Sequence, residues 1–110
     1  MLLPNSDRAV VDPVKLRDYV LNPGHPRGRH KARVFASALQ IFQPDAELLR
    51  QYIIEAAMSV NASVGDRDEY GQRYTVDFEC IRSERRAVIR TTWIVLSGED
   101  FPRLTTCFVL

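Results

Sequence analysis

The chain has 110 residues, of which 45% are hydrophobic and 26% charged, and this composition is typical of a single globular domain spanning residues 1–110. Its 15 Lys and Arg residues against 14 Asp and Glu residues give a net charge of +1, which neither favours nor excludes nucleic acid as a partner. No signal-peptide pattern is present, and no apolar run approaches the roughly 20 residues of a membrane span, so we expect a cytoplasmic protein without membrane contact.

The first helix is predicted to start at Asp12 and Pro13. An Asp side chain accepts hydrogen bonds from the free amides of a helix start, and Pro at the first helical position has no amide to leave unpaired. The prolines and the glycine of segment 22–26 end this helix early, because a residue before proline is pushed out of the helical conformation.

Two further helices are predicted, each with an apolar stripe at helical spacing. One begins near Arg29, and its stripe consists of Val34, Phe35, Ala38, Leu39 and Phe42. The other begins at Pro44, and its stripe consists of Leu48, Leu49, Tyr52, Ile53, Ala56, Ala57 and Val60. Both stripes are expected to pack on a sheet formed by the rest of the chain.

After Asn61 the apolar period becomes that of a strand. Segments 73–81, 87–97 and 103–110 alternate, a shorter strand is predicted near 62–64, and 65–72 is predicted as a polar loop. In the last strand, Leu104, Thr106, Phe108 and Leu110 are expected on one face, and Arg103, Thr105, Cys107 and Val109 on the other. The predicted fold class is α+β, with N-terminal helices packed on one face of a three- to four-stranded antiparallel sheet.

A basic cluster, 27–33, opens the second helix with four Arg or Lys residues and one His. Unpaired amides and the positive dipole end at a helix start, together with Arg29 and Lys31, suggest a phosphate site. His30 is a candidate general base, since cationic neighbours favour the neutral imidazole. His25 is a weaker candidate. The alternatives are a solvated, charged first turn and a structural histidine.

The polar face of the sheet is a second candidate site. If Tyr74, Val76, Phe78, Ile89 and Trp93 pack on the helices, the opposite face carries Arg73, Thr75, Arg90, Thr92, Arg103 and Thr105. Arginine matches phosphate oxygens with paired donors, and threonine can position a phosphate or a ribose hydroxyl. An ordinary solvated face with cross-strand Thr and Arg pairs is the alternative.

The sequence supports neither a metal nor a cofactor. The acidic segment 65–72 lacks the spacing of a calcium loop, and the chain has no GxGxxG, P-loop, CxxC or HExxH motif. Cys80 and Cys107 fall among apolar residues of strands, so we expect buried free thiols.

Three blocks of sequence resemble a bacterial domain family of unknown function, which occurs alone and at the C-terminal tips of polymorphic secreted toxins. The blocks are segment 21–35, with the pattern LNPxHPxGxHKARVF, segment 68–74, with DEYGQRY, and segment 105–109, with TTCFV, and the resemblance extends from Leu3 to Leu110. Toxin tips of this organisation often look like the barnase, EndoU, colicin and RelE group of metal-independent ribonucleases. The chain has no obvious Glu/His pair of the barnase type.

This resemblance implies a metal-independent RNA endonuclease of toxin type. The implied catalytic residues are His30, Arg90, Thr92 and Thr105, and the implied substrate-binding residues are Arg29, Lys31 and Arg73. His30 would take the proton of a ribose 2′-hydroxyl, and the arginines would stabilise charge on the phosphoryl oxygens. The expected partners are RNA and a small, acidic immunity protein or antitoxin. The alternative is a non-catalytic protein-binding module or an inactive domain derived from a toxin.

Overall fold

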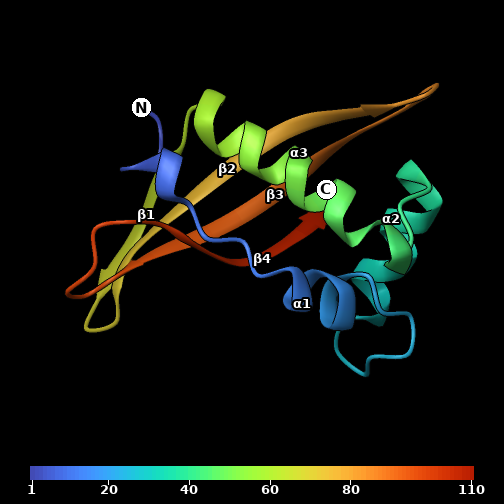
Figure 1. The fold of residues 1–110 in the computed structure, drawn as a ribbon, viewed down its shortest axis with the longest axis horizontal. Coiled ribbons are helices and arrows are strands. Elements are labelled where there is room, and N and C mark those ends of the chain that lie inside the picture. The colour runs from blue at the N-terminus through green and yellow to red at the C-terminus, as the bar shows by residue number, and fades with distance from the viewer.

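The computed structural model describes residues 1–110, with the helices before the sheet (Figure 1). The helical elements are η1 (Ser6–Arg8), α1 (Pro13–Lys15), η2 (Leu16–Val20), α2 (Arg29–Leu39), η3 (Gln43–Asp45) and α3 (Ala46–Ser59). The strands are β1 (Ser63–Asp68), β2 (Gly71–Arg82), β3 (Arg85–Leu96) and β4 (Arg103–Val109). They form one antiparallel sheet in the order β1-β2-β3-β4, which confirms the predicted α+β class.

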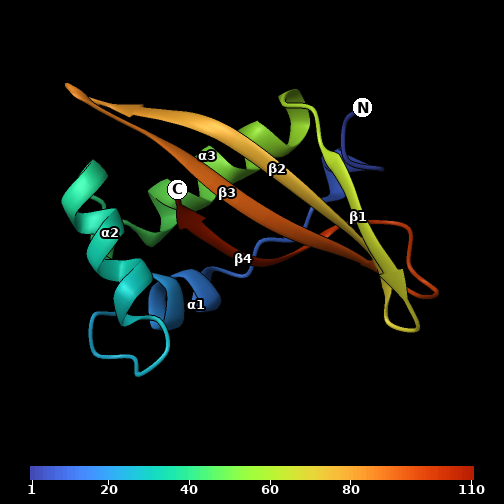
Figure 2. The same cartoon turned by 180° about the vertical axis from the view of Figure 1, so that it is seen from behind.

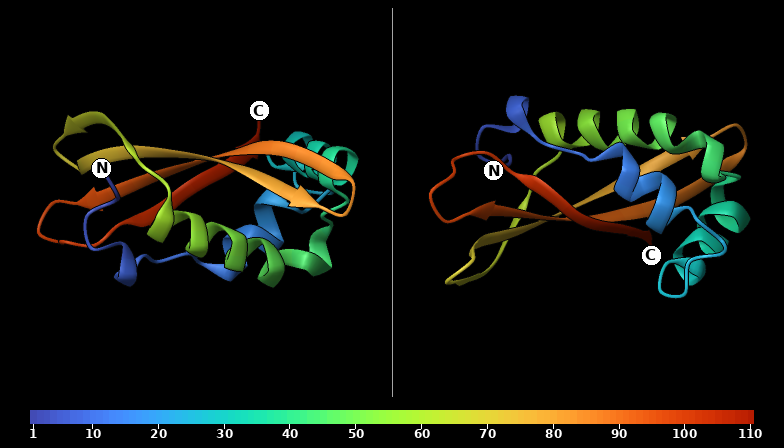
Figure 3. Two further views of the ribbon diagram at one scale, coloured as in Figure 1. Left: turned by 90° about the horizontal axis from the view of Figure 1, so that it is seen from above. Right: turned by 60° about the horizontal axis from the view of Figure 1, so that its bottom comes forward.

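The helices take different positions around the sheet. Figure 3 shows α3 along one face of the sheet, and Figures 1 and 2 show α2 near the C-terminal end of β4, beside the long β2–β3 hairpin. The buried core between helices and sheet includes Phe35, Leu39, Leu49, Ile53, Val76, Ile89 and Trp93. No helix is long and apolar enough to span a membrane.

The first helix begins as predicted. The Oδ1 atom of Asp12 accepts a hydrogen bond from the amide of Val14 at 2.9 Å, and Pro13 occupies the first helical position. The helix then widens into a π-helical turn, η2, which ends at Val20 and is followed by Leu21 as its C-cap. Within η2, Leu16 and Val20 are fully buried, so this short element is held by its apolar face.

The start of α2 is held against η2 by a close backbone contact. A Cβ atom at Gly28 would lie 1.9 Å from the carbonyl oxygen of Tyr19, so only glycine fits there. The Nδ1 atom of His25 accepts hydrogen bonds from the amides of Arg27 and Gly28, each at 3.0 Å. His25 is therefore a structural residue that fixes the turn before α2.

The predicted stripe of α2 is wrong at its end. The helix stops at Leu39 because Gln40 takes a left-handed conformation, with φ of 51°, and its amide donates to the carbonyl of Ala36. Phe42 lies outside the helix and is 52% exposed, and Val34, within the helix, is 42% exposed. The buried face of α2 consists of Ala32, Phe35 and Leu39.

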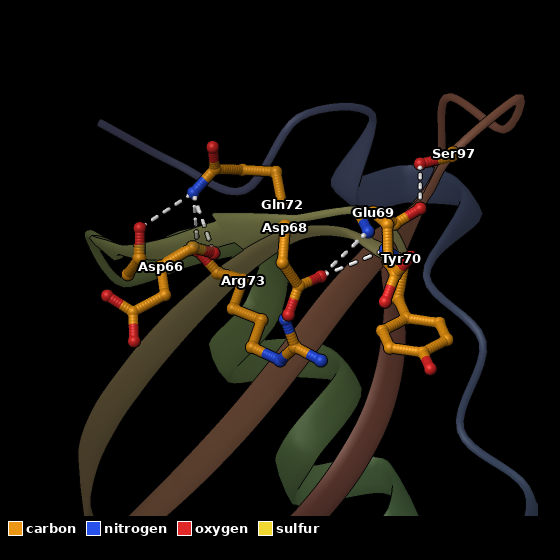
Figure 4. A network of polar contacts seen from close by, with 9 residues as sticks. Asp66, Asp68, Glu69, Tyr70, Gln72, Arg73 and Ser97 are labelled. Carbon is orange, nitrogen blue, oxygen red and sulfur yellow. Dashed lines mark hydrogen bonds and ion pairs between the residues drawn. The ribbon is translucent and has the colours of Figure 1, made fainter.

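The prediction that segment 65–72 is a loop is also wrong. Strand β1 extends to Asp68, and the chain turns at Glu69 and Tyr70 into β2. Figure 4 shows how Asp68 stabilises this turn, with Oδ1 accepting from the amides of Tyr70 and Gly71 and Oδ2 from Arg73. Ser97 adds a hydrogen bond to the carbonyl of Glu69 from the β3 side. The polar residues of this segment thus stabilise a hairpin.

A β-bulge in β4 changes the predicted alternation of the last strand. Thr92 pairs with Thr106 but Trp93 pairs with Leu104, so Thr105 has no partner of its own across the ladder. Beyond the bulge, Cys107 is fully buried on the core face, whereas Thr106 and Phe108 lie opposite Thr92 and Arg90. Thr106 and Phe108 therefore belong to the face away from the core, contrary to the prediction.

Candidate functional site

The basic side chains at the start of α2 have no anionic partner. None of the ion pairs in the structure involves Arg27, Arg29, Lys31 or Arg33. The reason lies in the sequence, because segment 19–44 contains no Asp or Glu residue. The start of α2 is therefore a cationic surface whose charge is not neutralised by the protein itself.

His30 and Lys31 line a groove between α2 and β4. This groove, called here the inner groove, has a volume of about 360 Å³ and is lined by His30, Lys31, Val34, Thr106, Phe108 and Val109. The Oγ1 atom of Thr106 is buried and has no hydrogen-bond partner in the structure. Lys31 donates from Nζ to the hydroxyl of Tyr19 at 3.3 Å, which holds the amine beside the groove. An anion in the groove would meet a cation and an imidazole, and it would lie beside a buried hydroxyl that has no partner in the protein.

The sheet register places two further predicted residues beside this groove. Arg90 is directly opposite Phe108, and Thr92 is directly opposite Thr106. Neighbouring strands lie about 4.8 Å apart, so both residues are one strand away from the groove lining. Thr105, at the bulge, forms a hydroxyl–hydroxyl hydrogen bond with Thr92. His30, Lys31, Arg90, Thr92 and Thr105 thus lie around one region of the molecule.

Arg90 is already paired with a carboxylate that the sequence analysis did not identify as part of the site. Its Nε and Nη2 atoms donate to Oδ1 and Oδ2 of Asp77 at 2.9 and 2.8 Å. The hydrogen bond from Arg90 holds the pKa of Asp77 below its usual value of 3.8. A guanidinium has five N–H donors, so this pair leaves Nη1 able to bind a further anion. Asp77 orients Arg90 across the strands.

The remaining predicted residues lie elsewhere. Arg73 donates to Asp68 at 2.6 Å at the β1–β2 hairpin (Figure 4), and it is separated from Asp77 by four residues of β2. At a strand rise of about 3.3 Å per residue, this separation is about 13 Å. Arg103 is paired with Glu99 through two hydrogen bonds of 2.9 and 3.0 Å. Arg29 does not line the inner groove.

Neither cysteine is suited to nucleophilic chemistry. Both are buried and free, and burial raises the pKa of Cys107 to about 12. A thiol with this pKa remains protonated at neutral pH, whereas the thiolate is the reactive form. The structure contains no group of three His, Cys, Asp or Glu residues placed to hold a metal ion.

The fold and the sequence place this α+β domain among known proteins. Residues 2–110 match the model of the family described as "Domain of unknown function (DUF6883)", and the chain belongs to this family. This finding confirms the expected family of unknown function.

One similar solved structure is a chain of the "Contact-dependent growth inhibition toxin - immunity protein complex from Klebsiella pneumoniae 342". The two chains are 17% identical, with a TM-score of 0.69 over 92% of this chain and 99% of that chain. At this identity the similarity shows a shared fold. No curated protein matches the chain.

Proposed function

We propose that this domain is a metal-independent endoribonuclease of a toxin–immunity pair, and that the inner groove is its active site. The observation that carries this proposal is the meeting of His30 and Lys31 with the unpartnered hydroxyl of Thr106 in one groove. The groove combines an imidazole, the side chain most often used as a general base, with donors for a phosphate.

In this mechanism His30 takes the proton of a ribose 2′-hydroxyl. The 2′ oxygen forms a bond to the adjacent phosphorus while the bond to the 5′ oxygen breaks. Water supplies the proton of the new 5′-hydroxyl, and the proton held by His30 passes to the hydroxide that remains. The products are a 2′,3′-cyclic phosphate and a 5′-hydroxyl end. Lys31 and the Nη1 atom of Arg90 neutralise the phosphoryl oxygens, and the hydroxyls of Thr92, Thr105 and Thr106 position the phosphate. Arg29 and Arg73, outside the inner groove, bind no reacting phosphate in this proposal.

Two further observations support this function. The cationic surface at the start of α2 has no protein carboxylate on it, so it remains available to attract a polyanion. The fold is also shared with a chain from a toxin–immunity complex, which supports a place for this domain in such a pair. The small acidic immunity protein or antitoxin expected from the sequence is part of the proposal.

The test is incubation of total RNA with purified protein in EDTA, followed by end-group analysis of the fragments. We expect discrete fragments with cyclic phosphate ends, and a loss of about 100-fold or more in cleavage rate for His30→Ala, since general-base catalysis typically contributes this much. Arg67→Ala is the matched control, because Arg67 is an exposed β1 residue that forms no ion pair and lines no part of the inner groove. Absence of cleavage by the folded wild-type protein would overturn the proposal.

A second candidate is a non-catalytic protein-binding module, or an inactive domain derived from a toxin. The observation that favours it is that Arg73, Arg90 and Arg103 each bind a carboxylate of the protein itself. The charges of these three sheet arginines are thus already neutralised by the protein, without RNA. This candidate predicts that His30→Ala changes no function and that unpartnered expression of the wild-type protein does not harm its host.

A further inference from the structure

A second groove lies on another side of α2 and has a different chemistry. This outer groove has a volume of about 390 Å³. Its lining is chiefly apolar and consists of Leu21, Pro23, Ala32, Ala36, Phe42 and Pro44, together with Arg29, Arg33 and Gln43. It is thus an apolar depression with two cationic side chains.

Helical geometry separates the outer groove from the inner one. Arg29 and Arg33 are four residues apart and share one stripe of α2, and both line the outer groove. His30 and Val34 follow them by one residue each and line the inner groove. One residue corresponds to about 100° around a helix, so the two grooves lie on different sides of α2.

Phe42 is exposed in the outer groove because the backbone around it is fixed in place. The left-handed Gln40 directs the chain away from α2, and Oδ2 of Asp45 accepts from the amide of Phe42 at 2.8 Å. The next residue, Gln43, donates from Nε2 to the carbonyl of Arg17 at 2.9 Å. These contacts fix the backbone that carries the 52% exposed aromatic ring of Phe42, so the ring is presented at a defined place on the surface.

We propose that the outer groove binds a protein segment that carries a large apolar side chain flanked by carboxylates. The apolar side chain packs against Phe42 between the two prolines, and the carboxylates pair with Arg29 and Arg33, which have no anionic partner in the protein. An aromatic side chain beside arginine is the composition that dominates binding energy at protein interfaces.

The same lining offers little for reading the polar edges of RNA bases. Phe42 and the two arginines could stack on a base, but the one uncharged polar side chain of the lining is Gln43, whose amide nitrogen already donates within the protein. RNA binding in the outer groove is therefore an outcome that the cleavage assay below tests. Identification of the occupant as the immunity partner rests on the proposed function. On that basis the partner docks beside the cleavage groove, on a surface that can be altered without touching His30.

The binding test uses a short, fluorescein-labelled synthetic peptide with Phe and Leu flanked by Asp and Glu. Its control peptide has Asn and Gln in place of the acidic residues. By fluorescence anisotropy we expect saturable, salt-sensitive binding of the acidic peptide, weakened by about tenfold or more in Phe42→Ala and in Arg33→Glu, as at an interface hot spot. Arg67→Glu and His30→Ala should bind like wild type. No binding by wild type, equal binding of both peptides, or equal binding by Phe42→Ala would overturn the inference.

The cleavage assay separates this inference from the proposed function. Phe42→Ala is expected to cleave RNA at the wild-type rate while losing the peptide. If wild type binds the peptide but cleaves no RNA, the ribonuclease proposal fails and the docking site stands. If Phe42→Ala loses RNA cleavage and keeps its fold by circular dichroism, the outer groove belongs to the RNA and the inference fails.

Discussion

The cations of α2 and the arginines of the sheet differ in their partners. Arg73, Arg90 and Arg103 each hold a carboxylate, whereas Arg27, Arg29, Lys31 and Arg33 hold none. The latter four belong to segment 19–44, which contains none of the 14 Asp and Glu residues of the chain. The other 11 Lys and Arg residues and all 14 Asp and Glu residues lie in the rest of the chain. The net charge of +1 therefore does not reveal that segment 19–44 is cationic.

This difference shows how each region is positioned. The sheet arginines are held by the strand register and by ion pairs, so their side chains have defined places without a ligand. The cations of α2 are placed by the helix beneath them, whose buried face of Ala32, Phe35 and Leu39 is fixed in the core. The orientation of the cationic surface thus depends on apolar packing at the start of α2.

The largest expected effect comes from Gly28→Ala, which disturbs that packing. The added Cβ would lie 1.9 Å from the carbonyl oxygen of Tyr19, so η2 and α2 must separate. We expect a loss of about 2–3 kcal/mol in the free energy of unfolding, as for other overpacked sites, measured by urea denaturation. The control is Gly24→Ala, where the nearest atom would be at 3.4 Å. Equal stability of the two variants would contradict the proposed contact.

A smaller effect is expected from Thr91→Val, which tests the inner side of the sheet. The buried hydroxyl of Thr91 donates to the carbonyl of Val76 at 2.7 Å and accepts from Nε1 of Trp93 at 2.8 Å. Valine keeps the shape but leaves the indole N–H without its acceptor, so we expect a loss of about 1–2 kcal/mol. Thr75→Val, at a half-buried position of β2 with no side-chain hydrogen bond, should change little. Similar unfolding midpoints for both variants would show that the Thr91 network adds no stability.

Local sequence signals predicted the elements whose causes are local. Asp12 caps its helix through an amide two residues away, and the alternation of 73–81 gives the buried face of β2 correctly. The errors lie where distant residues decide the conformation. The bulge at Thr105 has its carbonyl bound by Nζ of Lys15 at 3.1 Å, a contact across 90 residues of sequence. No period within the last strand contains that information.

The candidate site divides in the same way. The pairing of Asp77 with Arg90 could have been predicted from the sequence. A two-residue turn at Ser83 and Glu84 places Arg82 opposite Arg85, and the same register places Asp77 opposite Arg90. The inner groove was not accessible, because it depends on how α2 docks against β4 and on the bulge that turns Thr106 to its side. The outer groove was not predicted either, because Phe42, which lines it, was expected to lie on the buried face of the second helix.

The smallest expected effect on stability comes from breaking the ion pair between Arg90 and Asp77, and this effect depends on pH. Arg90→Met keeps the aliphatic stem but removes the partner that lowers the pKa of Asp77. A carboxyl whose pKa is lower in the folded than in the unfolded protein stabilises the fold above its unfolded pKa, and this contribution disappears as pH falls through the folded pKa. Wild type should therefore be more stable than Arg90→Met at about pH 7, and the difference should vanish well below the usual value of 3.8.

The matched variant for the other region is Arg33→Met, which removes a cation without a carboxylate partner. Its stability relative to wild type should not depend on pH through the acidic range, because Arg33 forms no ion pair with a carboxylate. Denaturation series at several pH values measure both differences, and the other carboxylates of the chain cancel in each comparison. A pH-independent difference for Arg90→Met would mean that Asp77 is not held ionised by Arg90. The two arginines would then be equally free to bind a phosphate, and the contrast between sheet and helix would disappear.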